Sequence, residues 1–291
     1  MKVGVQMISD DFRGKYKYHY LNGIPLFELY HTNTELNCIN FLTLNRMVNN
    51  AVCDDWFNKK IKKGVTLYNE IECIKLPAPN PTLEKYSFFE TVSRRRSIRN
   101  YSKIPLSLEE LSTILFYSAG ISGKYDETEQ HPRQLLRTYP SAGALFPINL
   151  YLFINNVEGL DKGIYYYDAI NNNIKCLNKY CNIDTLCEVL SYDGISLQGA
   201  CAIFMLANME LVGYKYGERG YRFINIEAGH IAQNFYLVST AIGIGTVALG
   251  GFLDEELLEL LPLDREKYFM LYQLVIGNIN FNSDYWFPPS K

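Results

Sequence analysis

The stretch RTYPSAGALFPINLY, residues 137–151, decides the fold of this chain. Pro140 to Ala144 are small or rigid residues that stand directly before an apolar segment typical of a β-strand. Small side chains let the backbone approach another group closely, and proline fixes the direction of that approach. Such a turn suits a flat ligand that accepts hydrogen bonds from backbone N–H groups. A tight loop whose small residues serve packing alone is the alternative that this stretch leaves open.

The composition indicates a full-sized globular protein. The chain has 291 residues, of which 48% are hydrophobic, so it can bury a large core. Its net charge is −3, which argues against a broad nucleic-acid surface. We therefore expect no nucleic-acid partner.

Cysteine and histidine usage argues against a metal centre and against a disulfide framework. The seven cysteines are odd in number, no two have CxxC spacing, and there are four histidines. The N-terminal residues lack the apolar run of a signal peptide, and no apolar run reaches the ~18 residues of a membrane span. We expect no metal, no membrane partner and a cytoplasmic location.

Helix and strand patterns mix without a regular βαβ period, which favours an α+β fold. Apolar runs predict strands at 148–154, 163–168, 200–208 and 268–277, and helical spacing predicts helices at 84–93, between Ser107 and Gly120, and at 221–245. Residues 1–80 are irregular in pattern, and 76–85 carries three prolines. We expect an N-terminal extension of residues 1–80 and one domain of residues 81–291. The polar stretch 123–137 is expected to be a loop.

Arginines and a serine cluster in SRRRSIRNY, residues 93–101. Guanidinium groups and a hydroxyl placed this closely suit a phosphate, which accepts several charge-assisted hydrogen bonds at once. A solvated basic turn is the alternative, and this stretch alone favours it, because charge runs are usually solvated. In GTVALGGF, residues 245–252, Gly250 and Gly251 would allow a ring to approach closely, although the spacing is not that of a dinucleotide fingerprint.

Two further stretches carry polar groups that could take part in catalysis or binding. In ANMELVGYKYGERGYR, residues 207–222, Lys215 next to Tyr216 would supply a general base and a proton donor if both were desolvated. Two exposed loop residues are the alternative, which the local sequence favours. On the long apolar helix, Glu227, His230 and Asn234 share one face, which predicts a ligand or a subunit interface there. We assign His230 the role of a satisfied core histidine.

Together and in this order, these motifs resemble the FMN-dependent nitroreductase superfamily. Within it they resemble the SagB-type dehydrogenases, the azoline oxidases of thiazole/oxazole-modified peptide biosynthesis. RRSIRNY is similar to the early phosphate motif, RTYPSAGALFPINLY to the SagB-type signature, and GERGYRFINIEAGHIAQNFYLVSTAIGIGTVALGGF to the central helix and flavin-side turn. LYHTNTEL, residues 29–36, resembles a Tyr-His-x-x-Thr element of these enzymes. The resemblance covers roughly residues 25 to 280.

The resemblance implies an intertwined homodimer with two FMN molecules at the interface, on a nitroreductase-like fold with a mostly antiparallel sheet flanked by helices. It implies that the phosphate and ribityl chain are held by Arg95, Arg96, Ser97 and Arg99, that the flavin ring lies against Pro140, Ser141, Ala142 and Gly143, and that its reactive nitrogen faces Leu249, Gly250 and Gly251. Many relatives add basic residues after the last core strand. Here only Lys291 follows, so that side of the phosphate site is left unassigned.

The activity that the resemblance implies is oxidation of a peptidyl azoline to an azole, with Lys215 as the base, Tyr216 as its helper or proton relay, and dioxygen reoxidising the flavin. The substrate would be a modified precursor peptide, with a cyclodehydratase as a further partner. Residues 1–80 would contact the peptide or wrap the dimer. Two rival functions stay open: an NAD(P)H-dependent nitroreductase-type reductase, and a flavin-containing docking subunit of a peptide-modifying complex.

Overall fold

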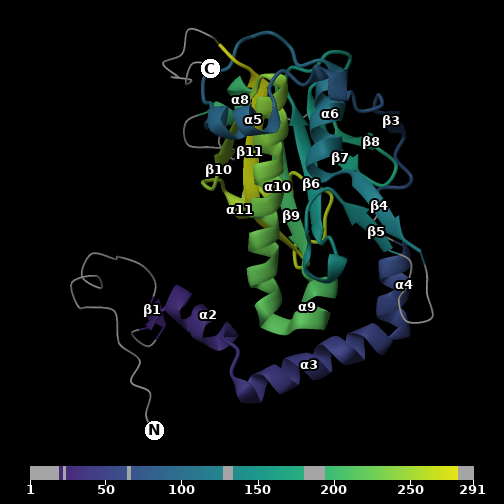
Figure 1. The fold of residues 1–291 in the computed structure, drawn as a ribbon, viewed down its shortest axis with the longest axis vertical. Helices are drawn as coiled ribbons and strands as arrows, with labels where there is room; N and C mark the ends of the chain where they lie inside the picture. The colour runs from purple at the N-terminus through teal and green to yellow at the C-terminus, as the bar shows by residue number, and fades with distance from the viewer. Residues whose placement is uncertain (1–19, 22–23, 64–66, 127–133, 180–193, 281–291) are drawn as a thin grey trace. The chain divides into compact units, whose positions relative to one another are not determined.

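The structure is a computed structural model that describes residues 20–21, 24–63, 67–126, 134–179 and 194–280 (Figure 1). The chain divides into two compact units, residues 1–46 and residues 47–291. In the first, β1 (Tyr20–Leu21) pairs antiparallel with β2 (Ile24–Pro25), and α2 (Leu26–Thr34) follows. Helix α3 (Cys38–Cys53) runs from the first unit into the second. The second unit therefore includes residues 47–80, which the sequence assigns to the extension.

Among the described residues, the second unit is built on one seven-stranded sheet in which every pair of neighbours is antiparallel. In spatial order the strands are β10 (Ile244–Leu249), β11 (Tyr268–Asn278), β9 (Cys201–Asn208), β6 (Ile148–Ile154), β7 (Gly163–Asp168), β8 (Asn173–Asn178) and β3 (Cys73–Lys75). This arrangement confirms the expected α+β fold with a mostly antiparallel sheet.

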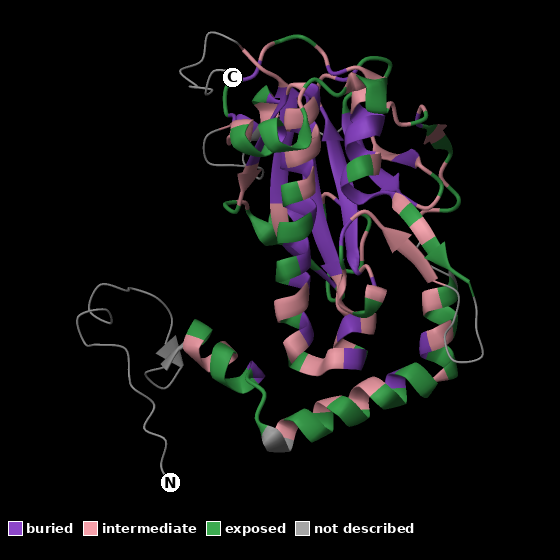
Figure 2. Ribbon diagram, in the orientation of Figure 1, coloured by how far each residue is buried: buried purple, intermediate pink, exposed green. Residues whose placement is uncertain are grey.

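The central strands are buried on both faces, which explains why their sequences are apolar runs without alternation. All seven residues of β6 are buried, and Figure 2 shows the centre of the sheet in the colour of buried residues. Leu150 and Leu152 join one core cluster with α6 and α10, whereas Tyr151 and Phe153 join a second cluster on the opposite face. The two clusters follow from the twofold period of a strand, which sends successive side chains to opposite faces.

Helices cover the sheet and position the site. Besides the end of α3, the described part of the second unit holds α4 (Asp55–Lys63), α5 (Phe88–Arg94), α6 (Leu108–Ala119), α8 (Ile195–Gln198), α9 (Glu210–Tyr216), α10 (Gly220–Ile242) and α11 (Asp254–Glu259). Helix α6 begins at the predicted capping box, in which Ser107 Oγ accepts from Glu110 N and the Glu110 carboxylate accepts from Ser107 N. Helix α10 contacts α6 and β10 and ends at Gly243, which has φ +79°.

Several local expectations were wrong. The described part of residues 26–63 is largely helical rather than irregular, and the polar stretch 123–137 contributes β4 (Ile121–Tyr125) and β5 (Gln134–Arg137), an antiparallel pair. The helix expected at 84–93 is shorter and begins later, at Phe88, and its Phe88 and Phe89 are exposed. Tertiary packing decides short segments such as β4, β5 and α5, because their own pattern is too brief to do so. Within the described parts of the chain, no helix is both long and apolar enough to cross a membrane.

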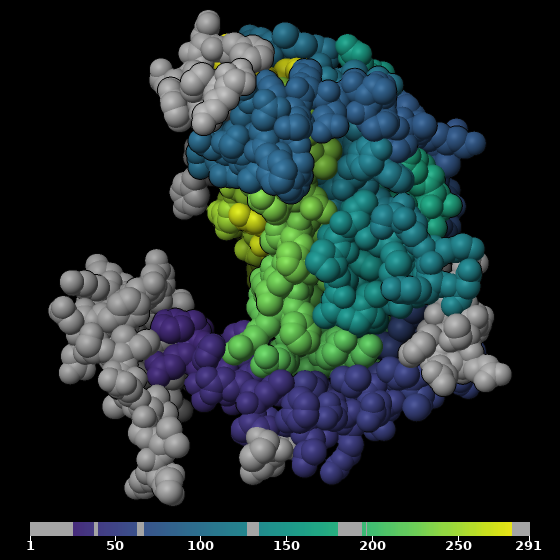
Figure 3. Space-filling model, in the orientation of Figure 1, coloured from purple at the N-terminus to yellow at the C-terminus, as the bar shows by residue number. Residues whose placement is uncertain are grey.

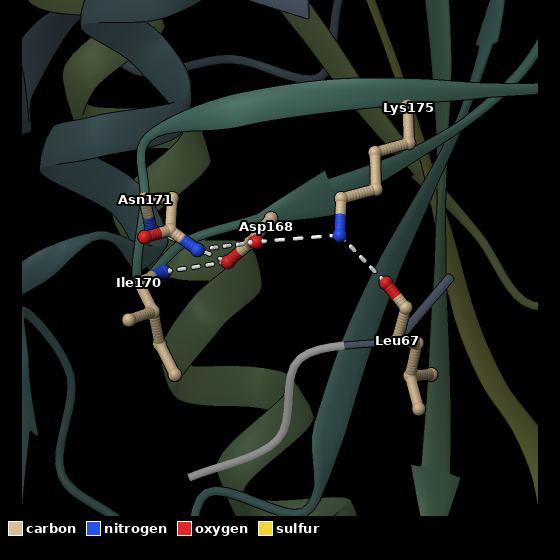
Figure 4. Close-up of polar contacts among 5 residues, drawn as sticks. All are labelled: Leu67, Asp168, Ile170, Asn171 and Lys175. Carbon is tan, nitrogen blue, oxygen red and sulfur yellow. Dashed lines mark hydrogen bonds and ion pairs between the residues drawn. The ribbon is translucent and has the colours of Figure 1, made fainter. Parts of the chain in front are cut away.

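A buried ion pair closes the β7–β8 turn (Figure 4). Lys175 Nζ lies 3.6 Å from Asp168 Oδ2, and the two side chains are 6% and 1% exposed. The carboxylate also accepts from Ile170 N, from Asn171 N and from Asn171 Nδ2, and Lys175 Nζ donates to Leu67 O at 2.8 Å. These hydrogen bonds satisfy both charges inside the protein.

Candidate functional site

The turn before β6 has a strained backbone. Gly143 has φ +61°, and two residues with side chains, Ala144 and Phe146, have φ +50° and +48°. Left-handed conformations cost non-glycine residues about 1 kcal/mol or more each, so the surroundings must hold this turn in place. Ser141 Oγ does so, because it accepts from Phe146 N at 3.0 Å and donates to Glu227 Oε2 at 2.5 Å.

Glu227 anchors the turn to α10. Its side chain is 2% exposed, and its second oxygen, Oε1, has no hydrogen-bond partner among the described residues. Burial raises the pKa of this carboxyl from its ordinary 4.5 to about 8, although the hydrogen bond from Ser141 and the charge of Arg137 oppose the rise. At neutral pH the group is therefore largely protonated. In this state it is a neutral hydrogen-bonding anchor.

The predicted polar face of α10 divides into two parts. Asn234 Nδ2 donates to Ser118 O and to Thr138 O, both at 3.3 Å, and so holds the segment before the turn. His230 is exposed, so the expectation of a core histidine was wrong. Three residues along a helix turn the direction of a side chain by about 60°, so His230 lies at the solvent-facing border of the face whose buried part holds Glu227.

Lys215 and Tyr216 lie on α9, and their side chains meet the turn. A Cβ at Gly143 would stand 2.5 Å from Tyr216 Oη and 2.7 Å from Lys215 Nζ. Helix α10 contacts both η2 (Ala142–Ala144) and α9, and Figure 3 shows the teal and green surfaces of these parts of the chain side by side. The fold therefore brings together the turn and the lysine–tyrosine pair, which stand far apart in the sequence.

The environment of Lys215 is apolar. Its side chain is 9% exposed, so the alternative of an exposed loop residue was wrong. Nζ lies 5.3 Å from the centre of the Tyr216 ring and 5.8 Å from that of Phe57. Burial lowers the pKa of this lysine and raises the pKa of the Tyr216 phenol. The pair thus holds a lysine that loses its proton more readily than usual beside a phenol that keeps its own.

The arginine motif follows α5 in an extended conformation. Ser97 forms a parallel bridge with Thr246 of β10, and Ile98 N donates to Thr246 O at 2.9 Å. Extended residues alternate in direction. Arg95 accordingly lies with its Cζ 5.1 Å from the Tyr236 ring, and Ser97 Oγ lies 3.0 Å from Tyr236 Oη.

Arg96 points to a different place. Its Nη1 donates to Ser93 O and Arg95 O. It lines a cavity of about 250 Å³ together with Lys85, Arg94 and other residues. Arg99 is exposed, and its Nη1 lies 3.5 Å from Ser97 O. Of the four residues expected at the phosphate, Arg95 and Ser97 both lie against Tyr236 and Arg99 lies near Ser97, whereas Arg96 lines the cavity with Lys85.

Tyr236 connects the arginine motif to the glycine pair. Its Oη accepts from Ala248 N at 2.8 Å, near the end of β10, where Leu249 is the last residue. Gly250 and Gly251 follow and are exposed, and a Cβ at either would meet no described atom within 4 Å. Sequence reasoning missed Tyr236. The available signal was a phenol on a buried helix face, which needs a hydrogen-bond partner.

Comparison with known proteins places these motifs in context. The model of the family described as "Nitroreductase family" matches residues 92–278. A protein of Methanocaldococcus jannaschii, MJ1384, whose name assigns it to the nitroreductases, is 34% identical over 198 residues, which are 68% of this chain and 93% of that protein. The microcin B17-processing protein McbC of Escherichia coli is 29% identical over 160 residues, which are 51% of this chain and 57% of McbC.

One solved structure shares the fold along most of the chain. It is the E. coli microcin synthetase McbBCD complex with truncated pro-MccB17 bound. The match has a TM-score of 0.55 and 21% identity, and it covers 87% of this chain and 86% of that one. At this identity the likeness concerns the fold.

Proposed function

Because the chain belongs to the nitroreductase family, we propose that it is an FMN-dependent dehydrogenase that oxidises peptidyl azolines to azoles. The family supports an oxidoreductase. Similarity to McbC, named as a microcin B17-processing protein, supports a modified peptide as the substrate. The McbBCD complex supports companion subunits, of which a cyclodehydratase fits the formation of azolines.

The observation that carries the proposal is the contact of Gly143 with Lys215 and Tyr216. An azoline loses a proton from one carbon and a hydride from its neighbour, so a base must stand where the flavin ring is expected. The turn expected against that ring touches Lys215 and Tyr216, which offer a base and a phenol. A lysine with a lowered pKa is suited to this task at neutral pH.

The residues present fit FMN. Gly250 and Gly251 leave open space on their Cα atoms, which a flat ring requires. Arg95 and Ser97 place a guanidinium and a hydroxyl beside Tyr236, which is also hydrogen-bonded to β10 just before the glycine pair. A guanidinium and a hydroxyl suit the phosphate and the ribityl chain of FMN. Arg99 is exposed, and its Nη1 lies 3.5 Å from Ser97 O, so it stands close to the same group. The chemistry that bound FMN supplies is acceptance of the hydride.

The chain's own groups perform the proton transfer. Lys215 Nζ takes the Cα proton of the azoline, and burial of the amine maintains a neutral fraction for this purpose. Tyr216 keeps its proton, because burial raises its pKa, and donates a hydrogen bond to the lysine or the substrate. Glu227 keeps the turn fixed through Ser141 and does not touch the reacting atoms.

We place the active molecule in a homodimer with FMN at the interface. Large apolar side chains on α5 are exposed in the single chain: Phe88 is 65%, Phe89 83% and Val92 48% exposed. On α10, Ile226 is 57% exposed. Surfaces of this kind are usually covered by a partner, and a second copy would cover them here.

The proposal is tested with Lys215→Ala, and with Lys60→Ala as a matched control, because Lys60 is a half-exposed lysine that pairs with Glu210. Both variants should bind FMN and show the flavin spectrum of the parent. With an azoline peptide and dioxygen, Lys215→Ala should lose at least ~10²-fold in rate, the scale of general-base catalysis, and Lys60→Ala should not. Parental rates in Lys215→Ala would remove Lys215 from the mechanism.

An anaerobic titration with NADPH distinguishes the proposed dehydrogenase from a nicotinamide-dependent reductase. The name of MJ1384 favours the reductase. Rapid bleaching of the flavin without an azoline would support a nicotinamide-dependent reductase and contradict our proposal. A flavin that stays oxidised until an azoline peptide is added would support the dehydrogenase. Protein that takes up no FMN would overturn the cofactor assignment.

A further inference from the structure

Helix α4 lies outside the residues that match the family, 92–278, yet it reaches the lysine of the proposed site. Its Phe57 is 1% exposed, and Lys215 Nζ lies 5.8 Å from the centre of the Phe57 ring. The ring and the turn at Gly143 are thus both neighbours of the same amine. A segment ahead of the family domain contributes part of the environment of Lys215.

Three kinds of contact hold α4 against α9. Tyr214 Oη donates to Asp54 Oδ2 at 2.9 Å, immediately before α4. The Tyr214 ring stacks on Phe57 with centroids 5.8 Å apart and meets Trp56 edge-on at 5.3 Å. Lys60 pairs with Glu210 at 3.5 Å. The hydrogen bond and the ring contacts of Tyr214 fix where the helix stands, which places the Phe57 ring beside the lysine. The Lys60–Glu210 pair is about half exposed and contributes little to this placement.

We propose that Phe57 is a positioning residue of the active site, whose ring covers Lys215 and holds its amine against the turn at Gly143, beside Tyr216. The inference rests on the proposed role of Lys215 and deepens it. It assigns to α4 a function in the reaction, in addition to any contact that the N-terminal residues make with a peptide.

Two opposing effects act on the covered amine. The face of an aromatic ring attracts an ammonium group and would favour the charged form. Removal of water from the amine favours the neutral form. Burial lowers the pKa of Lys215, and the removal of water is the cause of this shift.

The titratable groups on the surrounding elements have other partners. Asp54 accepts from Tyr214, Lys60 pairs with Glu210, and Glu227 of α10 accepts from Ser141. Tyr216, the titratable neighbour on α9 itself, keeps its proton because burial raises its pKa. The lowered pKa of the Lys215 amine therefore depends on its cover by apolar groups such as the Phe57 ring.

The test measures the amine directly and needs no azoline. The flavin-loaded protein is labelled with acetic anhydride across a pH series, and the peptide that contains Lys215 is quantified by mass spectrometry. Phe57→Ala should raise the pH midpoint of Lys215 labelling by about one unit, a tenfold fall in the neutral fraction at pH 7, because water reaches the amine. Phe57→Leu, which keeps an apolar cover, should restore most of the parental midpoint.

Trp56→Ala is the matched control. Trp56 is the adjacent aromatic residue on α4 and also contacts Tyr214, but it is 42% exposed. Its removal should leave the Lys215 midpoint unchanged. If Phe57→Ala does not fold, Phe57→Val is read in the same way. A midpoint in the folded Phe57 variant that equals the parental one, or an equal shift in Trp56→Ala, would overturn the inference.

The outcome is separate from that of the proposed function. Should Lys215→Ala oxidise azolines at the parental rate, the base assignment fails, whereas the labelling result still reports whether Phe57 covers the amine. With the dehydrogenase active, Phe57→Ala should lower kcat, leave KM for the peptide nearly unchanged and move the pH profile in the same direction as the labelling midpoint. A change confined to KM would contradict a positioning role.

Discussion

Replacing Lys175 with methionine should destabilise the protein strongly. Methionine keeps an apolar stem of similar length and removes the ammonium from a pair in which Asp168 is 1% exposed. Removing one partner of a buried ion pair typically costs about 3–5 kcal/mol, because the other charge stays buried and uncompensated. Asp168 still accepts three hydrogen bonds, from Ile170 N, Asn171 N and Asn171 Nδ2, so we expect the lower end, about 3 kcal/mol.

A second lysine–aspartate pair in the same region provides the control. Lys179 Nζ lies 3.3 Å from Asp161 Oδ2, closer than the 3.6 Å of the buried pair, but these side chains are 55% and 74% exposed. Lys179→Met should therefore cost less than about 1 kcal/mol, because water screens exposed pairs and solvates the remaining charge. The buried pair is the longer of the two, so a larger loss of stability in Lys175→Met would show that burial matters more than distance.

The measurement is urea unfolding of the flavin-loaded proteins, followed by far-ultraviolet circular dichroism at fixed flavin concentration. Lys175→Met should lower the midpoint clearly, Lys179→Met hardly, and the double variant Lys175→Met with Asp168→Asn should recover part of the loss because no charge is left buried. Equal effects of the two single variants, or a loss below about 1 kcal/mol for Lys175→Met, would refute the reasoning.

Three further predictions concern the site. Gly143→Ala should lower the rate of azoline oxidation at least ~10-fold, because the new Cβ would displace Lys215 Nζ and Tyr216 Oη. It should also lower the free energy of unfolding by about 1–2 kcal/mol, because φ +61° strains alanine. Single-turnover rates check the first effect and melting curves the second. Glu227 has a folded pKa of about 8, above its ordinary 4.5, so the parent should lose stability as pH rises from about 5 to 8. Glu227→Gln should lose less over that range in thermal melts, and parallel curves would contradict the raised pKa. Arg95→Ala should weaken FMN binding by a larger factor than Arg96→Ala in fluorescence titrations, because Arg95 lies with Ser97 against Tyr236 and Arg96 does not. The reverse order would place the phosphate at the cavity that Arg96 lines.

Local signals in the sequence were sufficient for the central strands and for the start of α6. The apolar runs at 148–154 and 163–168 became β6 and β7, since strands buried on both faces must be continuously apolar. The Ser107–Glu110 capping box marked the start of α6, because such a box satisfies backbone N–H groups within one turn. Order and spacing of the motifs also led to the family.

Sequence pattern was a poor guide wherever a residue's environment comes from distant segments. The local sequence around Lys215 predicts an exposed lysine. In the structure the side chain is buried, because Phe57 and the turn at Gly143 pack around it. Adjacency suggested that Arg95 and Arg96 share one ligand, yet an extended backbone sends them in different directions.

By itself, the sequence determined the four central strands β6, β7, β9 and β11, the capped start of α6, the glycine-bearing turn and the family, because each depends on backbone preferences and periodicity over a few consecutive residues. Only the tertiary structure decided that Ser141 is anchored by Glu227, that Tyr236 joins the arginine motif to the end of β10, and that Lys215 meets Gly143 under the ring of Phe57. Burial, and the pKa shifts that follow from it, arise from contacts between segments far apart in the chain, and no local pattern encodes those contacts.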